Sequence, residues 1–158
     1  MYVDSVRQGV PLSSLINTLA DKNKRRSEQQ MDKRKILIVD DEEYVRLLVK
    51  SALSRDYAVL EASDGEEAIN IAYTQQPDLI LMDILMPNLD GYTACYEIKR
   101  AQATRAIPVV MLTGIGHELN KKLAQELGAD GYITKPFNLQ DLLDTVKHYE
   151  LVTCPLGA

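Results

Sequence analysis

The chain has 158 residues, of which 46% are hydrophobic and 26% are charged, and its formal net charge is −5. This length suits one domain with a single core plus short additional segments and leaves little room for a second core. The acidic net charge argues against binding of nucleic acid over the whole surface. No apolar run reaches the roughly 20 residues of a membrane-spanning helix. We therefore expect a cytoplasmic globular protein.

The first 33 residues do not follow the pattern of the rest of the chain. Apolar side chains at helical spacing between positions 10 and 19 predict a short amphipathic helix that begins after Ser13 or Ser14. The stretch from Asp21 to Lys35 is polar and basic, and we expect residues 1–33 to be a partly disordered extension with a basic linker. Two interpretations remain open: a docking helix on a tether, or residues that precede the true start of the protein at Met31.

From Lys35 onward, short apolar runs alternate about five times with amphipathic stretches. Such an alternation is typical of βαβ units around a parallel sheet whose two faces are both covered. The predicted strands are 36–39, 58–60, 79–82, 107–112 and 131–134. We therefore predict an α/β domain with about five helices over residues 34–150, followed by a C-terminal tail at 151–158.

Acidic side chains gather at the ends of two predicted strands. Asp40 and Asp41 follow the first strand, and Asp83 follows the third. Ligands of an open parallel sheet bind beyond the carboxyl ends of its strands, so the three carboxylates converge if these strands are neighbours. Their mutual repulsion favours a bound divalent cation, and oxygen ligands without Cys or His favour Mg²⁺. Capping of the next helix is an alternative role for Asp40 and Asp41.

Two more strand ends add hydrogen-bond donors to the same edge of the sheet. Thr113 ends the fourth predicted strand, and Lys135 follows the fifth. A hydroxyl and an ammonium group are the donors that a phosphoryl group needs, and an aspartate can be the nucleophile in phosphoryl transfer. The combination therefore predicts phosphoryl chemistry, with a metal ion and Lys135 offsetting charge on the phosphoryl oxygens.

This set of residues closely resembles the receiver domain of two-component response regulators, over residues 34–150. The resemblance rests on Asp40-Asp41, on the run from Met82 to Pro87 with Asp90-Gly91, on Thr113-Gly114 and on Lys135-Pro136-Phe137. It implies a doubly wound, flavodoxin-like sheet of five parallel strands in the order 2-1-3-4-5. It also implies a cis peptide bond between Lys135 and Pro136.

The resemblance further implies which residues hold the metal ion and accept the phosphoryl group. Asp83 is expected to be the phosphoacceptor. Asp40 and Asp41, together with Asp83 and the backbone carbonyl of Leu85, are expected to bind Mg²⁺.

Other residues are expected to contact the phosphoryl group and to respond to it. Thr113, Gly114 and Lys135 would bind its oxygens, and Thr113 and Lys135 would assist the transfer. Thr113 and Tyr132 would be the switch residues, because the added negative charge favours a second arrangement of the surface around the last helices.

The implied protein is a phosphoacceptor in signalling and not an enzyme, with no chemistry beyond its own phosphorylation and dephosphorylation. A sensor histidine kinase or a histidine phosphotransfer protein would donate the phosphoryl group. Because the chain ends within ten residues of the last predicted helix, near Tyr149, we expect a stand-alone receiver that signals through a separate, unidentified partner protein.

Other functions fit the sequence less well. A receiver-like module that binds proteins without phosphorylation is the main alternative, although the whole reactive set is present. An aspartate phosphatase usually spaces its two acids by one residue, unlike Asp40-Asp41, and Asp-Asp-Glu-Glu would repel the phosphate of a flavin mononucleotide. Nucleic-acid binding through Lys22 to Lys35 would lack aromatic residues for stacking on the bases.

Overall fold

The computed structural model describes residues 11–31, 33–114 and 118–153, and the chain divides into two units, Met1–Lys33 and Arg34–Ala158. In the first unit, helix α2 spans Leu12–Met31. This helix is longer than the sequence predicted, because it continues through the polar stretch after Asp21. The stretch is rich in Lys, Arg and Gln, which lose little side-chain freedom in a helix.

The second unit contains five strands in one parallel sheet: β1 (Lys35–Val39), β2 (Ala58–Ala62), β3 (Leu79–Asp83), β4 (Val109–Thr113) and β5 (Gly131–Thr134). Their order is β2-β1-β3-β4-β5, which confirms the predicted doubly wound topology. Strand β4 begins two residues later than predicted. Pro108 has no N–H group to donate to a neighbouring strand, which explains the later start.

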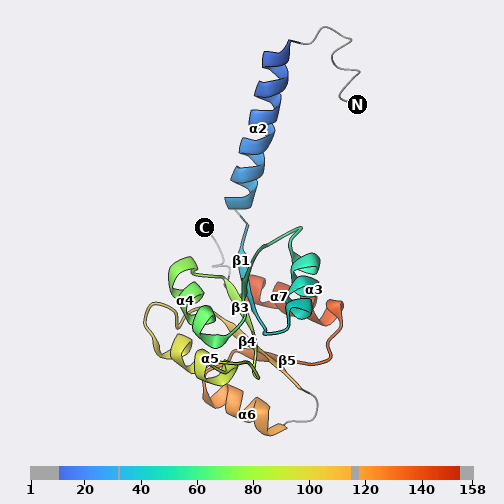
Figure 1. Ribbon diagram of the computed structural model, residues 1–158. Coiled ribbons are helices and arrows are strands. Elements are labelled where there is room, and N and C mark those ends of the chain that lie inside the picture. Colours follow the sequence, from blue (N-terminus) through green and yellow to red (C-terminus); the bar gives the residue numbers. More distant parts are fainter. Residues whose placement is uncertain (1–10, 32, 115–117, 154–158) are drawn as a thin grey trace. The chain divides into compact units, whose positions relative to one another are not determined.

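Helices cover both faces of this sheet (Figure 1). Helices α3 (Glu43–Leu53) and α7 (Leu139–Thr153) lie on one face, and α4 (Gly65–Gln75), α5 (Gly91–Arg100) and α6 (Glu118–Glu126) lie on the other. Helix α7 continues past the end predicted near Tyr149, so residues 151–153 of the predicted tail are helical. Among the described residues, no helix is both long and apolar enough to cross a membrane.

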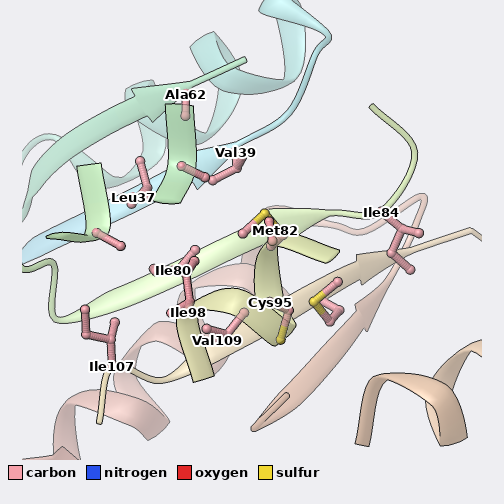
Figure 2. Packing of buried hydrophobic residues seen from close by; sticks show 14 of the residues in the cluster. Leu37, Val39, Ala62, Ile80, Met82, Ile84, Cys95, Ile98, Ile107 and Val109 are labelled. Carbon is pink, nitrogen blue, oxygen red and sulfur yellow. The ribbon is translucent and has the colours of Figure 1, made fainter. Parts of the chain in front are cut away.

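The buried side chains of the central strands explain the continuous apolar runs in the sequence. Side chains of β1, β3 and β4 that point to the α4–α6 face, such as Leu37, Ile80 and Val109, pack with Cys95 and Ile98 of α5 (Figure 2). The alternate side chains of the same strands pack against α3 and α7. Burial raises the pKa of the Cys95 thiol to about 11, which suits an inert core residue.

The start of α5 lies directly against the end of β3. Asp90 caps the helix, because its side chain accepts a hydrogen bond of 2.9 Å from the backbone N–H of Thr93. The next residue, Gly91, donates its backbone N–H to the carbonyl oxygen of Ile84 at 2.8 Å. A Cβ atom at Gly91 would lie only 2.0 Å from the carbonyl oxygen of Asp83, so glycine is needed for this close approach.

Candidate functional site

The carboxyl ends of β1 and β3 bring three carboxylates together. The two strands are parallel neighbours, Asp40 follows β1, and Asp83 is the last residue of β3. One carboxylate oxygen from each of Asp40, Asp41 and Asp83 lies within 4.8 Å of the other two. Asp40 and Asp83 are buried, whereas Asp41 is exposed, so the cluster opens to solvent on one side only.

Lys135 joins this cluster from the end of β5. Its Nζ atom lies 2.7 Å from Oδ2 of Asp40 and 3.2 Å from Oδ1 of Asp83. The other oxygen of Asp40 accepts a hydrogen bond of 2.9 Å from the backbone N–H of Glu42, so both oxygens of this fully buried carboxylate are paired. The backbone N–H of Lys135 donates to the carbonyl oxygen of Thr113, and its bond to Pro136 is cis.

Burial and like charge shift the pKa of the Asp83 carboxylate. Burial raises the pKa of Asp83, and the nearby charge of Asp40 raises it further, while attraction to Lys135 lowers it by less. Burial lowers the pKa of Lys135, but its hydrogen bond and charge interactions with Asp40 and Asp83 outweigh burial, so the net shift is upward. Lys135 is therefore a protonated counter-charge at neutral pH.

In metal-free buffer, Asp83→Asn is expected to raise the thermal unfolding midpoint at pH 7. Because the folded state raises the pKa of Asp83 above its ordinary value of 3.8, the stability that this group contributes is present at low pH and is lost as pH rises through the folded pKa. The gain from the amide should therefore shrink as pH falls towards 4. Thermal melts in EDTA across this range test the prediction, and a less stable variant at pH 7 would contradict it.

Two of the three carboxylates, Asp41 and Asp83, line a pocket, and Asp40 is buried beside them. The pocket has a volume of about 410 Å³, and its lining residues are Asp41, Glu42, Asp83, Ile84, Leu85, Tyr92, Leu112, Gly114 and Lys135. A set of oxygen ligands without Cys or His, open to water on one side, fits Mg²⁺, which keeps several waters in its shell. Asp40, Asp41 and Asp83 could thus hold this ion.

The remaining predicted site residues differ in their burial and in whether they line this pocket. Thr113 is buried at the end of β4, and Gly114 follows it as an exposed residue that lines the pocket. Leu85 also lines the pocket, and its side chain is 81% exposed. Tyr132 does not line this pocket: it is 42% exposed on β5 and lines a separate pocket of about 370 Å³ together with His148.

Two residues at the site were missed by sequence reasoning. Arg46 donates from its guanidinium group to the backbone carbonyl of Asp40 at 2.7 Å and so holds the loop after β1. Tyr92 lines the same pocket as Asp83, and its buried hydroxyl has no hydrogen-bond partner among the described residues. The position of Tyr92 directly after Asp90-Gly91 was a usable signal, whereas nothing in the sequence links Arg46 to the backbone of Asp40.

A family model for the response regulator receiver domain matches residues 36–147. Among curated relatives, the alkaline phosphatase synthesis transcriptional regulatory protein PhoP of Bacillus subtilis is 45% identical over 115 residues, which are 72% of this chain and 47% of PhoP. The probable transcriptional regulator ycf27 of Guillardia theta is 44% identical over 111 residues, which are 70% of this chain and 42% of that protein. The chain thus spans less than half the length of these relatives.

Solved structures agree with this match. A putative response regulator from Chloroflexus aurantiacus has a TM-score of 0.71 and 36% identity, and the alignment covers 75% of this chain and 98% of that one. The chemotaxis protein CheY4 of Vibrio cholerae has a TM-score of 0.70 and 31% identity, with 74% and 98% covered. From its sequence match and its fold together, this chain belongs to the response regulator receiver domain family.

Proposed function

We propose that this receiver accepts a phosphoryl group on Asp83, in the cytoplasm, from a sensor histidine kinase or a histidine phosphotransfer protein. The arrangement of Asp83 carries the proposal: its carboxylate ends β3, faces an open pocket, and lies beside two other carboxylates and the ammonium group of Lys135. Few roles other than phosphoryl transfer use an aspartate nucleophile next to a cation and a lysine.

In the proposed transfer, an Asp83 oxygen forms a bond to phosphorus while the bond from phosphorus to the donor's nitrogen breaks. Lys135 offsets negative charge on the phosphoryl oxygens, since its Nζ atom already lies 3.2 Å from Asp83. Asp40, Asp41, Asp83 and the carbonyl of Leu85 would hold Mg²⁺, which supplies further positive charge when bound. The backbone of Gly114, at the open rim of the pocket, would donate to the same oxygens.

The proposed switch connects β4 to β5. Phosphorylation replaces one carboxylate charge with about two negative charges, and a hydrogen bond from Thr113 to the phosphoryl group would draw the end of β4 inward. Thr113 pairs with Thr134 across the two strands, two residues from Tyr132, so movement of β4 would reach the exposed face of β5. Tyr132 would then change its exposure on that face.

We propose that the signal passes to a partner protein. Two solved structures support output through a separate protein. The structures of the Chloroflexus aurantiacus regulator and of CheY4 contain little besides the receiver, because the match covers 98% of each solved chain. The curated relatives support a second form, control of transcription, since both are named as transcriptional regulators and are more than twice as long as the matched segment. Binding to partners without phosphorylation is the remaining alternative, and the complete reactive set argues against it.

Intact mass after incubation with Mg²⁺ and acetyl phosphate tests the proposed chemistry. We expect one phosphoryl adduct that is labile in base, that is absent without metal, and that is lost in Asp83→Ala. Asp144→Ala, which changes an exposed aspartate of α7, is the matched control and should keep the adduct. If correctly folded wild-type protein gains no adduct, binding without phosphorylation becomes the better interpretation.

A further inference from the structure

Helix α2 carries an apolar face that no other described residue of its own unit covers. Leu12, Ile16 and Leu19 are 68%, 57% and 53% exposed, and together with Leu15 they follow the i, i+3, i+4, i+7 spacing of one helix face. Helices in proteins gain most of their stability from packing of an amphipathic face. The face therefore needs an apolar partner surface.

The same face of α2 becomes basic towards its C-terminal half. Lys22 follows Leu19 by three residues, and Arg26 follows it by seven, so both continue the line of the apolar side chains. A surface that fits this face must therefore be apolar at one end and acidic at the other.

The receiver unit has a groove with this combination of properties. The groove, which we call the α3 groove, has a volume of about 450 Å³, and its lining residues are Glu42, Val45, Leu48, Lys135, Pro136 and Phe137. Four of these side chains are apolar. Glu42 and the exposed Glu43 supply negative charge at the start of α3, next to the apolar part.

We propose that α2 of one copy binds the α3 groove of a second copy, and that reciprocal exchange closes a twofold-symmetric dimer. The apolar half of α2 covers Val45, Leu48 and Phe137, and the basic half lies against the acidic start of α3. Charge complementarity then fixes the direction of the helix in the groove. Lys135 lines both the α3 groove and the pocket that contains Asp83, so the bound helix lies beside Asp83.

Pairing between two α2 helices fits the same face less well. A parallel pair would place Lys22 and Arg26 of one helix next to the same residues of the other, where like charges repel. An antiparallel pair that avoids this repulsion overlaps only from Leu12 to Leu19, which is about two helical turns. This overlap leaves Lys22 and Arg26 of each helix outside the paired segment.

Sedimentation equilibrium of the unphosphorylated full chain tests the exchange. Leu19→Glu on α2 and Leu48→Arg in the groove should each weaken dimerisation at least tenfold. Two control variants introduce the same residues elsewhere: Asn17→Glu on the opposite face of α2, and Leu123→Arg at an exposed position of α6. Both should leave the dimer unchanged. A mixture of the Leu19→Glu and Leu48→Arg chains should form a mixed dimer, because it restores one intact contact.

Three outcomes would overturn the proposal: wild-type protein that stays monomeric at all concentrations, a Leu48→Arg chain that dimerises like wild type, or a mixture that does not associate. The second outcome would indicate pairing between α2 helices. Thermal melts check that Leu48→Arg folds, and Glu43→Arg replaces it if it does not, since Glu43 is exposed. No sample is phosphorylated, so these results are independent of the chemistry proposed for Asp83.

Discussion

Lys135→Met is expected to lower the free energy of unfolding of the metal-free protein by about 3 kcal/mol, at the low end for breaking a buried ion pair from one side. The change leaves the fully buried carboxylate of Asp40 with one hydrogen-bond partner among the described residues, the backbone N–H of Glu42. It also removes the only positive charge within 4.0 Å of Asp83 among the described residues. Urea unfolding in EDTA measures the loss.

Magnesium should restore part of this stability, because it supplies positive charge to the same carboxylates. We therefore expect Mg²⁺ to stabilise the Lys135→Met variant more than it stabilises wild type. The variant should also gain its phosphoryl adduct at least tenfold more slowly than wild type, since one group that stabilises developing charge is missing. An adduct that forms at the wild-type rate would remove Lys135 from the transfer.

Lys99→Met is the matched control for both measurements. Lys99 also pairs with an aspartate, Asp130, at 2.8 Å, and it donates to the carbonyl oxygen of Ile107 at 2.9 Å. It belongs to α5 and does not line the pocket that Asp83 and Lys135 line. Its loss should therefore reduce stability without changing the rate of phosphorylation, which separates the role of Lys135 in the site from a general effect of losing an ion pair.

The sheet could be predicted from the sequence because its central strands are buried on both faces. Runs such as 36–39 and 79–82 contain only apolar residues, and each lies next to a turn or helix signal, so they were predicted to be strands. The order of the strands in the sheet came from the resemblance to the receiver family. The length of α2 could not be predicted in the same way. The polar residues after Asp21 suit both a helix and a linker, and no periodic apolar face distinguishes the two.

The sequence predicted which strand ends meet at the site, but it did not predict the individual contacts there. Asp40 and Asp41 are identical in type and adjacent in sequence, yet one is fully buried and bonded to Lys135 while the other is exposed. That difference depends on the direction of the backbone where β1 ends. The contact of Arg46 with the carbonyl of Asp40 likewise depends on how α3 packs, which a residue pattern does not encode.

Gly91→Ala is expected to lower the free energy of unfolding by about 3 kcal/mol, the upper end for overpacking. At an ordinary helix position, the same change would stabilise the protein by about 0.5–1 kcal/mol. Here the new Cβ atom would lie 2.0 Å from the carbonyl oxygen of Asp83, 2.9 Å from its carbonyl carbon and 3.0 Å from Cα of Ile84. All three are backbone atoms, so no side chain can move aside to make room.

The strain should affect the site as well as stability, because two of the clashing atoms belong to Asp83. To relieve it, either the start of α5 or the end of β3 must shift, and the second shift moves Asp83 away from Lys135. Gly114→Ala is the matched control, since a Cβ atom there meets no atom within 4 Å and should change stability by no more than about 0.5 kcal/mol. Urea unfolding with and without Mg²⁺ compares the two variants: Gly91→Ala should lose both stability and the stabilisation by Mg²⁺. Equal stability of the two variants would mean that the contact between α5 and β3 yields easily, and that Gly91 does not hold Asp83 in place.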